Sequence, residues 1–300
     1  MLGLGSTISK TSKKWDPLEL GDNLIGWWDF TDTSNMYQEI DSYTTASVVN
    51  GDKIGRIKNK AKSSDKLGTF LRATSDAERP ELKRFANKTY AIFDGSDDHL
   101  LGKAQASDTS YGGTANGKFS DATINVQGFS IFIVQESDAS TVTTDGKIVS
   151  IHGTELGDTT EWTGLMFQHD SGTDDFEAIF DYHGDSGDTD ESIVSTANLD
   201  TDPSLYSLVT ESGSNATVLY KNGSSNATGT TAGDSRMVFT NTDTQYDAVI
   251  IGEKYRANNG TASGHNFDGN ISEVIIVNKT MSTAEIKSMH RYLNGKHGLY

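Results

Sequence analysis

The sequence predicts an all-β sandwich that ends in one short helix. Short runs of β-branched and aromatic residues follow one another along the chain, and clusters of turn residues separate them. Glycine occurs 30 times and proline only 3 times, which fits short strands joined by tight turns. Helical spacing of apolar residues occurs only near residue 290. The predicted strands are 24–30, 89–94, 129–136, 147–152, 163–168, 176–183, 205–211, 216–221, 247–252 and 271–278.

One strand, two long connecting segments and one turn allow more specific predictions. In Phe129 to Val134 both faces are largely apolar, so we place this strand at the centre of a sheet. Residues 31–88 and 101–125 have weak strand signals and are expected to form loops with short strands at the rim. Asn222-Gly223 predicts a type I′ hairpin turn, because both residues tolerate a positive φ.

The last thirty-three residues give the clearest local prediction. A turn at 268–270 leads into an apolar strand, and a helix then begins at Ser282. Ser282 is the expected N-cap, and Glu285 three residues later completes a capping box. Gly295 is the expected end of the helix. The apolar residues at helical spacing are Ile286, Met289 and Leu293.

Four segments resemble the laminin-G-like and concanavalin A-like lectin domains of bacterial and viral proteins. They are Leu24-Ile-Gly-Trp-Trp-Asp-Phe30, Tyr90-Ala-Ile-Phe-Asp-Gly-Ser-Asp-Asp-His-Leu100, Val218-Leu-Tyr-Lys-Asn-Gly223, and Asp268 to Val277 with the helix after it. They occur in the order that the family has. The resemblance implies a concanavalin A-like jelly-roll β-sandwich over residues 23–300. It leaves function open, because this fold carries lectins, hydrolases and scaffolds.

Residues 1–22 precede these segments and are rich in glycine, serine, threonine and lysine. We expect an N-terminal attachment arm whose apolar side chains bind a partner protein; they are Leu2, Leu4, Ile8 and Trp15. The alternative is that these side chains pack back on the sandwich or are disordered. The opening Met-Leu-Gly-Leu-Gly-Ser also resembles the N-termini of structural proteins of marine tailed phages.

Composition excludes several classes of partner. With 25 basic and 42 acidic residues the net charge is −17, which argues against nucleic-acid binding. There is no cysteine, which favours a bacterial or viral protein made in a reducing cytoplasm. The N-terminus does not read as a signal peptide, and no segment has the length of apolar residues that a membrane span needs.

No catalytic motif stands out in the sequence. Sandwich glycosidases of this fold carry Glu-x-Asp-x-x-Glu on one strand, and the nearest segment, Glu177 to Asp181, lacks two of these carboxylates. Zinc-ligand spacing and a Gly-x-Ser-x-Gly nucleophile elbow are both absent. We therefore expect no enzyme activity, no catalytic residue and no metal site that the motifs define.

Two features remain as candidate binding sites. The acidic segment 181–191 offers oxygen ligands, so calcium is the one cofactor that the sequence leaves open. Trp162 lies among polar residues at a strand entrance and is the candidate platform on which a sugar ring could stack.

These observations lead to two functional hypotheses. The first is a non-enzymatic structural protein on the exterior of a phage virion, as a capsid decoration or head fibre, made in the host bacterial cytoplasm. Its partners would be other virion proteins, in a homo-oligomer or multi-copy assembly. The alternative is a tail fibre, adsorption protein or other carbohydrate-binding module that recognises a host-surface polysaccharide.

Overall fold

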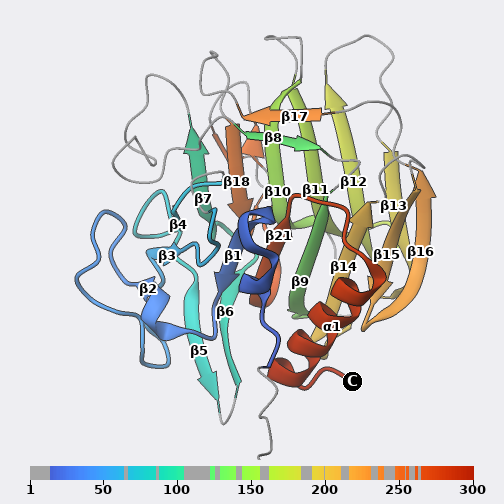
Figure 1. Ribbon diagram of the computed structural model, residues 1–300. Coiled ribbons are helices and arrows are strands. Elements are labelled where there is room, and N and C mark those ends of the chain that lie inside the picture. The colour runs from blue at the N-terminus through green and yellow to red at the C-terminus, as the bar shows by residue number, and fades with distance from the viewer. Residues whose placement is uncertain are drawn as a thin grey trace, which may run out of the picture.

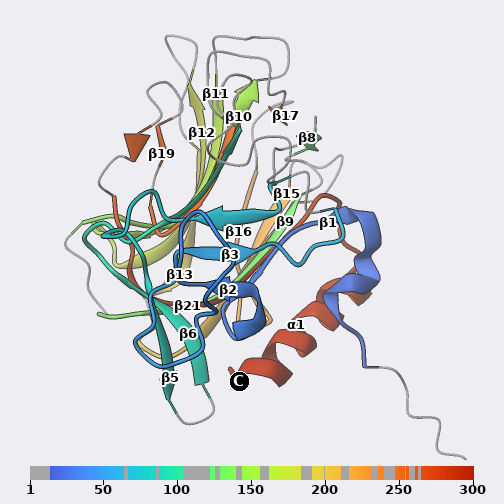
Figure 2. The same cartoon turned by 90° about the vertical axis from the view of Figure 1, so that its left-hand side faces the viewer.

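The computed structural model describes residues 14–63, 67–85, 88–104, 122–125, 129–139, 144–155, 162–183, 191–198, 200–210, 216–230, 236–239, 247–253, 255–256, 261–262 and 265–300. Two antiparallel sheets pack face to face, and one α-helix lies on the outer side of the first sheet (Figures 1 and 2). This is the all-β jelly-roll sandwich with a short C-terminal helix that the sequence predicts.

The first sheet has the strand order β16-β15-β14-β9-β21-β6-β5, and β1 pairs with β21 beside this path. Its strands are β1 (Leu24–Asp29), β5 (Glu81–Phe85), β6 (Lys88–Asp94), β9 (Ser130–Ser137), β14 (Ser204–Thr210), β15 (Ala216–Lys221), β16 (Ser224–Thr230) and β21 (Asp268–Val277). Strand β9 lies in the middle of this sheet, as its two apolar faces predict.

The second sheet has the strand order β13-β12-β11-β10-β18-β7-β4-β3-β2, with β17 and β8 attached through β10. Its strands are β2 (Met36–Tyr37), β3 (Arg56–Lys58), β4 (Phe70–Arg72), β7 (Leu100–Ala104), β8 (Ala122–Asn125), β10 (Gly146–Glu155), β11 (Trp162–Asp170), β12 (Asp175–His183), β13 (Glu191–Asn198), β17 (Arg236–Phe239) and β18 (Asp247–Ile251). A separate pair joins β19 (Tyr255–Arg256) to β20 (Thr261–Ala262).

Each strand expected from the sequence has an observed counterpart, and the short strands of 31–88 lie at the rim as expected. Strands β13, β16, β17, β19 and β20 were not predicted. Of these, β13 and β16 are rich in Ser, Thr, Ala and Asn, so they lack the apolar alternation that marks a half-buried strand.

Side chains of β9 alternate between two hydrophobic clusters. Ile131 and Ile133 point into the cluster between the sheets, whereas Phe132 and Val134 point to the outer face under the helix. Phe132 pairs with Ile275 of β21, and both belong to the outer cluster. The sequence predicts Phe132 and Ile275 in the core between the two sheets, and this prediction is wrong for both. The helix makes the outer face of this sheet a second core, so both faces of its central strands are apolar.

The adjacent tryptophans of β1 follow the same alternation. Trp28 is fully buried between the sheets, and Trp27 is buried in the outer cluster. The outer cluster is closed by the helix α1 (Thr283–His297), whose Met289 and Leu293 face it.

The helix begins as the sequence predicts but ends later. The Ser282 side chain accepts from Glu285 N, and the Glu285 carboxylate accepts from Ser282 N, which completes the capping box. Gly295 lies inside the last turn rather than after it. Gly298, at φ 66°, is the residue that adopts the left-handed conformation and ends the helix.

The described chain starts beside this helix, and its first residues pack on the sandwich. Trp15 makes an edge-to-face contact with Tyr292 of α1, with ring centroids 6.3 Å apart. The 3-10 helix η1 (Pro17–Asn23) follows and buries Leu20 in the outer cluster. Figure 2 shows η1 and α1 on the same side of the molecule. Residues 15–22 thus contact the domain, while the attachment role of Trp15 stays a prediction.

Candidate functional site

A hollow of about 430 Å³ lies between the exposed side of α1 and the turn that joins β15 to β16. In Figure 1 the chain end marked C lies next to this turn. The hollow is lined by Asn222, Gly223, Ser224, Lys287, His290, Arg291 and Tyr300, which we call the Tyr300 pocket.

The backbone of Tyr300 is held in place by one side chain of the helix. Oδ1 of Asn294 accepts hydrogen bonds from Leu299 N at 3.0 Å and Tyr300 N at 2.9 Å, and Nδ2 donates to Tyr300 O at 2.7 Å. Gly298 turns the chain so that Leu299 packs against the outer cluster. The residues after the helix therefore form a fixed hook, and its last ring is 55% exposed.

The ring of Tyr300 rests on the β15–β16 turn. Gly223 has φ +77°, and a Cβ placed on it would lie 2.5 Å from the Tyr300 hydroxyl, so only glycine allows this approach. The neighbouring Asn222 has φ 50° and its Oδ1 accepts from Leu205 N at 2.9 Å, which fixes the turn to β14. The turn is the Asn-Gly turn that the sequence predicts.

Two cations stand at the rim of the pocket. Lys287 and Arg291 are exposed and lie one helical turn apart on α1. Arg291 donates from Nε to Lys287 O and from Nη2 to Ser288 Oγ, which orients its guanidinium. Among the described residues, neither cation forms an ion pair with a carboxylate.

The floor of the pocket is neutral at pH 7. His290 is buried beside Phe132 and Tyr220, and its Nε2 lies 2.9 Å from Ser207 Oγ. Burial lowers the pKa of His290 to about 4, so the imidazole carries no charge near neutrality. The pocket therefore combines a rigid exposed ring, two cations and the polar side chains of a turn.

A second, smaller cavity of about 230 Å³ lies where β6, β9 and β21 meet the end of α1. It is lined by Lys88, Lys296 and His297, and the last two are held by carboxylates. Lys296 is 2.8 Å from Asp29 Oδ1 and 2.7 Å from Glu273 Oε2, and His297 Nε2 is also 2.7 Å from Glu273. Lys296 and His297 thus anchor α1 to the sheet.

The two carboxylates of this anchor resemble a catalytic pair only in their proximity. Asp29 and Glu273 are paired residues on β1 and β21, and both are almost completely buried. Burial would raise the pKa of Asp29, but the charges of Lys296 and Lys60 outweigh it and lower the pKa to about 2. Both carboxylates are buried and bound to Lys296, so neither is placed to reach a glycosidic bond, and the pair does not fit acid–base cleavage of glycans.

A hydroxyl–imidazole–carboxylate row also occurs outside the pocket. Thr74 Oγ1 lies 3.1 Å from His99 Nε2, and His99 Nδ1 lies 3.1 Å from Glu253 Oε2. The Thr74 hydroxyl donates to Glu78, so its hydrogen points away from the ring. Burial works to lower the pKa of His99, but its hydrogen bond to Glu253 and the charge of that residue raise it. Because the Thr74 hydroxyl gives its hydrogen to Glu78 and not to the imidazole, the row stabilises the fold and does not activate a nucleophile.

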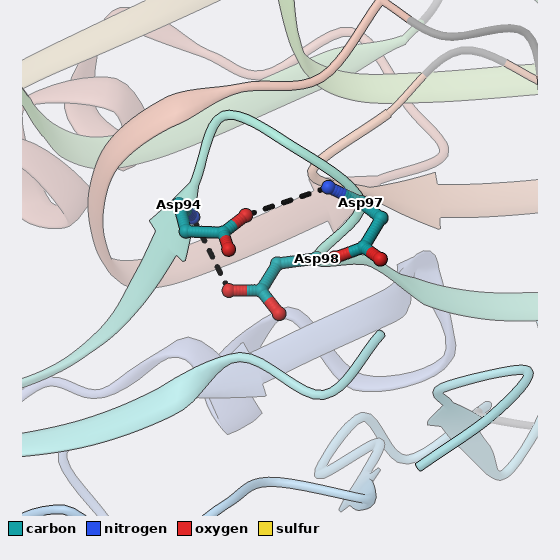
Figure 3. A group of neighbouring side chains, drawn as sticks. All are labelled: Asp94, Asp97 and Asp98. Carbon is teal, nitrogen blue, oxygen red and sulfur yellow. Dashed lines mark hydrogen bonds between the residues drawn. The ribbon is translucent and has the colours of Figure 1, made fainter. Parts of the chain in front are cut away.

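Three aspartates gather on the loop between β6 and β7 (Figure 3). One carboxylate oxygen from each of Asp94, Asp97 and Asp98 lies within 4.8 Å of the others. Asp94 Oδ1 accepts from Asp97 N, and Asp98 Oδ2 accepts from Asp94 N, as the dashed lines show. Burial, and then the charge of Asp94, raise the pKa of Asp98 to about 6. Oxygen ligands suit calcium, but hydrogen bonds within the loop account for this arrangement without an ion.

The residues that the sequence singled out lie elsewhere. Leu2, Leu4 and Ile8 are outside the described residues. Trp162 begins β11, but its side chain and most of the acidic segment 181–191 are also outside the described part. The Tyr300 pocket was missed, although Asn222-Gly223 and the turn residues after the helix are its local signals. No helix among the described residues is long and apolar enough to cross a membrane.

Comparison with known proteins gives distant structural similarities. No protein-family model matches the sequence, and no curated protein matches it either. The CBM40 of Ruminococcus gnavus IT-sialidase, bound to α2,6 sialyllactose, is 14% identical with a TM-score of 0.40, over 57% of this chain and 94% of that chain. A Trypanosoma rangeli sialidase, in complex with 2,3-difluorosialic acid, is 9% identical with a TM-score of 0.48, over 91% of this chain and 33% of that chain. The function proposed below rests on the side chains of this chain.

Proposed function

We propose that this protein is a non-catalytic glycan-binding β-sandwich and that the Tyr300 pocket is its binding site. The observation that carries the proposal is the 55% exposed ring of Tyr300, whose main chain is held by Asn294 and whose hydroxyl lies against Gly223. A tyrosine ring offers a flat apolar face with a polar edge, and the C–H face of a sugar ring can stack on it. Because Asn294 and Gly223 fix the ring in advance, little side-chain entropy is lost when a ligand binds.

The groups around the ring are those that hydroxyl-bearing ligands require. Ser224 offers a donor and acceptor at the turn, and Arg291 offers donors at the helix. A hollow with one aromatic surface and a few convergent polar groups is typical of small-ligand sites. An open hollow also suits one or two residues of a longer polysaccharide.

The absence of catalysis is part of the proposal. Among the described residues, the buried pair Asp29 and Glu273 is bound by Lys296, and the pocket lining contains no acidic side chain. Glycan cleavage requires a carboxylic acid and a second carboxylate on either side of the scissile bond. We therefore expect binding without release of reducing sugar.

The test is a glycan array read with the full chain and two matched variants. Tyr300→Ala is expected to lose binding, whereas Phe85→Ala retains it. Phe85 is 72% exposed on β5, at the opposite edge of the same sheet, so it controls for the loss of an exposed aromatic ring. Equal thermal stability of the variants confirms that folding is unchanged. Glycan binding that survives Tyr300→Ala contradicts this site, and no binding to any glycan contradicts the function.

Where the protein acts is the subject of a separate proposal. We propose that the protein is displayed on a phage particle, in several copies beside other virion proteins, where a glycan-binding module would contact the host surface. The support is the resemblance of residues 1–6 to phage structural proteins and the lectin-like body. Mass spectrometry of purified particles should detect the chain, and its absence there would contradict the virion setting without affecting the glycan site.

A further inference from the structure

We infer that the Tyr300 pocket selects anionic saccharides, those that carry a carboxylate or sulfate group, over neutral ones. The inference rests on the proposed function and adds the ligand's charge. Several other cations of the described fold lie against carboxylates: Lys60, Lys221, Lys279 and Lys296 all have carboxylate partners within 3.0 Å. Lys287 and Arg291 have none among the described residues, yet the chain has a net charge of −17.

The lining supports the same charge preference. Its seven residues contain two cations, a neutral histidine and no acidic side chain. Exposed charges more than about 8 Å apart are largely screened at physiological ionic strength, so acidic side chains beyond that distance act only weakly at the pocket. The acidic surface farther away therefore does not cancel their attraction for an anion.

The orientation of Arg291 fits this role. Its Nε and Nη2 are bound to the Lys287 main chain and the Ser288 hydroxyl, while Nη1 has no partner among the described residues. A guanidinium fixed in this way can donate to an acidic group without losing much freedom. Lys287, one turn earlier, supplies a second positive charge at the same rim.

The smaller cavity of about 230 Å³ at the end of α1 does not support an anion preference. Its Lys296 is shared between Asp29 and Glu273, and its other lysine, Lys88, shares the lining with the carboxylate of Glu136. A carboxylate in the lining would repel an anion, and a lysine bound to two carboxylates has little net attraction left. The anion preference therefore belongs to the Tyr300 pocket.

The test compares matched ligands by calorimetry with the full chain. The ligands are an oligogalacturonide, its carboxyl-reduced neutral counterpart, a sulfated oligosaccharide, and acetate and sulfate as free ions. We expect at least one acidic saccharide to bind about tenfold more tightly than the neutral one, with no measurable binding of the free ions. The ranking of the two acidic saccharides shows whether carboxylate or sulfate is the group recognised.

Two sets of variants separate this inference from the proposed function. In Lys287→Gln/Arg291→Gln the preference should disappear while weak binding of the neutral saccharide remains, and in Lys62→Gln, an exposed lysine elsewhere, the preference should be unchanged. Equal affinities of the acidic and neutral saccharides for the unaltered chain would overturn the anion preference and leave the glycan site intact. If Tyr300→Ala binds the acidic saccharide as tightly as the unaltered chain does, the proposed site is wrong, and this inference is wrong with it.

Discussion

The side chain of Asn294 binds the main chain of Tyr300 at both of its polar groups, at 2.9 Å to N and 2.7 Å to O. One amide therefore fixes a residue six positions away, beyond the end of the helix. Because these bonds lie at the chain surface, each contributes about 1 kcal/mol or less to stability. Their main consequence is the fixed position of the Tyr300 ring.

Asn294→Ala should weaken glycan binding more than it weakens the fold. The variant keeps the Tyr300 ring but releases the hook, so a ligand must order the ring when it binds. We expect about a tenfold loss of affinity, with a change in unfolding free energy of about 1 kcal/mol. Asn50→Ala is the control, because Asn50 Oδ1 accepts from Arg84 N at the far edge of the sheet. Unchanged affinity in Asn294→Ala would contradict the importance of the hook.

Gly223→Ala should displace the ring directly. A Cβ at this position would lie 2.5 Å from the Tyr300 hydroxyl, and the φ of +77° is unfavourable for alanine, at a cost of roughly 1 kcal/mol. Gly295→Ala is the matched control, because a Cβ there meets nothing within 4 Å inside the helix. We expect Gly295→Ala to raise the melting temperature and Gly223→Ala to lower it, and only Gly223→Ala to lose binding. Equal effects of the two changes would refute the steric argument.

The sequence predicted these elements better than the pocket that they form. Capping by Ser282 and the Asn222-Gly223 turn are local, so a few residues determine each of them. The pocket joins that turn to the helix end, and this requires the register of β14 with β15 and the docking of α1 on β9 and β21. Those are long-range packing outcomes that spacing does not reveal.

The helix end shows a second limit of sequence reasoning. Gly295 and Gly298 both follow the apolar stripe, and either can end a helix. A glycine inside a helix costs only about 1 kcal/mol, and the contacts of Lys296 and His297 with Glu273 extend the helix past Gly295. These tertiary contacts decide between two glycines that the sequence leaves equivalent.

Glu273→Gln should destabilise the fold strongly. Glu273 is fully buried, accepts from Trp27 Nε1 at 2.6 Å, and is 2.7 Å from both Lys296 and His297. Removing one charge of a buried network leaves the others uncompensated, which costs about 3–5 kcal/mol. Asp22→Asn is the control, since its pair with Lys62 is exposed and contributes little. Urea unfolding measures the free energy of unfolding of both variants. If Glu273→Gln loses as little as Asp22→Asn, Glu273 does not anchor α1 to the sheet.

Stability should fall as the pH drops below 6.5 because of two buried histidines. Burial lowers the pKa of His169 to about 3 and that of His290 to about 4. The unfolded chain binds protons at these groups from pH 6.5 downward, but the folded chain does not, so stability present above pH 6.5 is lost as the pH falls. Asp98 works in the opposite direction. Its folded pKa of about 6 exceeds the unfolded value, so its contribution is full below pH 3.8 and is lost as the pH rises through 6.

His169→Gln isolates one of these contributions. Glutamine can still donate to Gln135 Oε1, the present partner of His169 Nε2, but it does not titrate. The variant should lose less stability than the unaltered chain between pH 6.5 and 4, whatever the offset between them at pH 7. Urea unfolding at half-unit pH intervals measures the two slopes. Parallel slopes would show that His169 is not held neutral by the fold.

Two N-terminal deletions should separate attachment from folding. Deleting residues 1–13 removes Leu2, Leu4 and Ile8, so on the attachment hypothesis the protein should no longer join the particle. Deleting residues 1–22 also removes Trp15 and Leu20, which pack against the outer cluster around α1. Burial of Leu20 alone is worth about 2 kcal/mol, so this deletion should lower the melting temperature. Normal incorporation of the shorter deletion would contradict attachment through the first thirteen residues, and unchanged stability of the longer one would contradict the packing of Trp15 and Leu20.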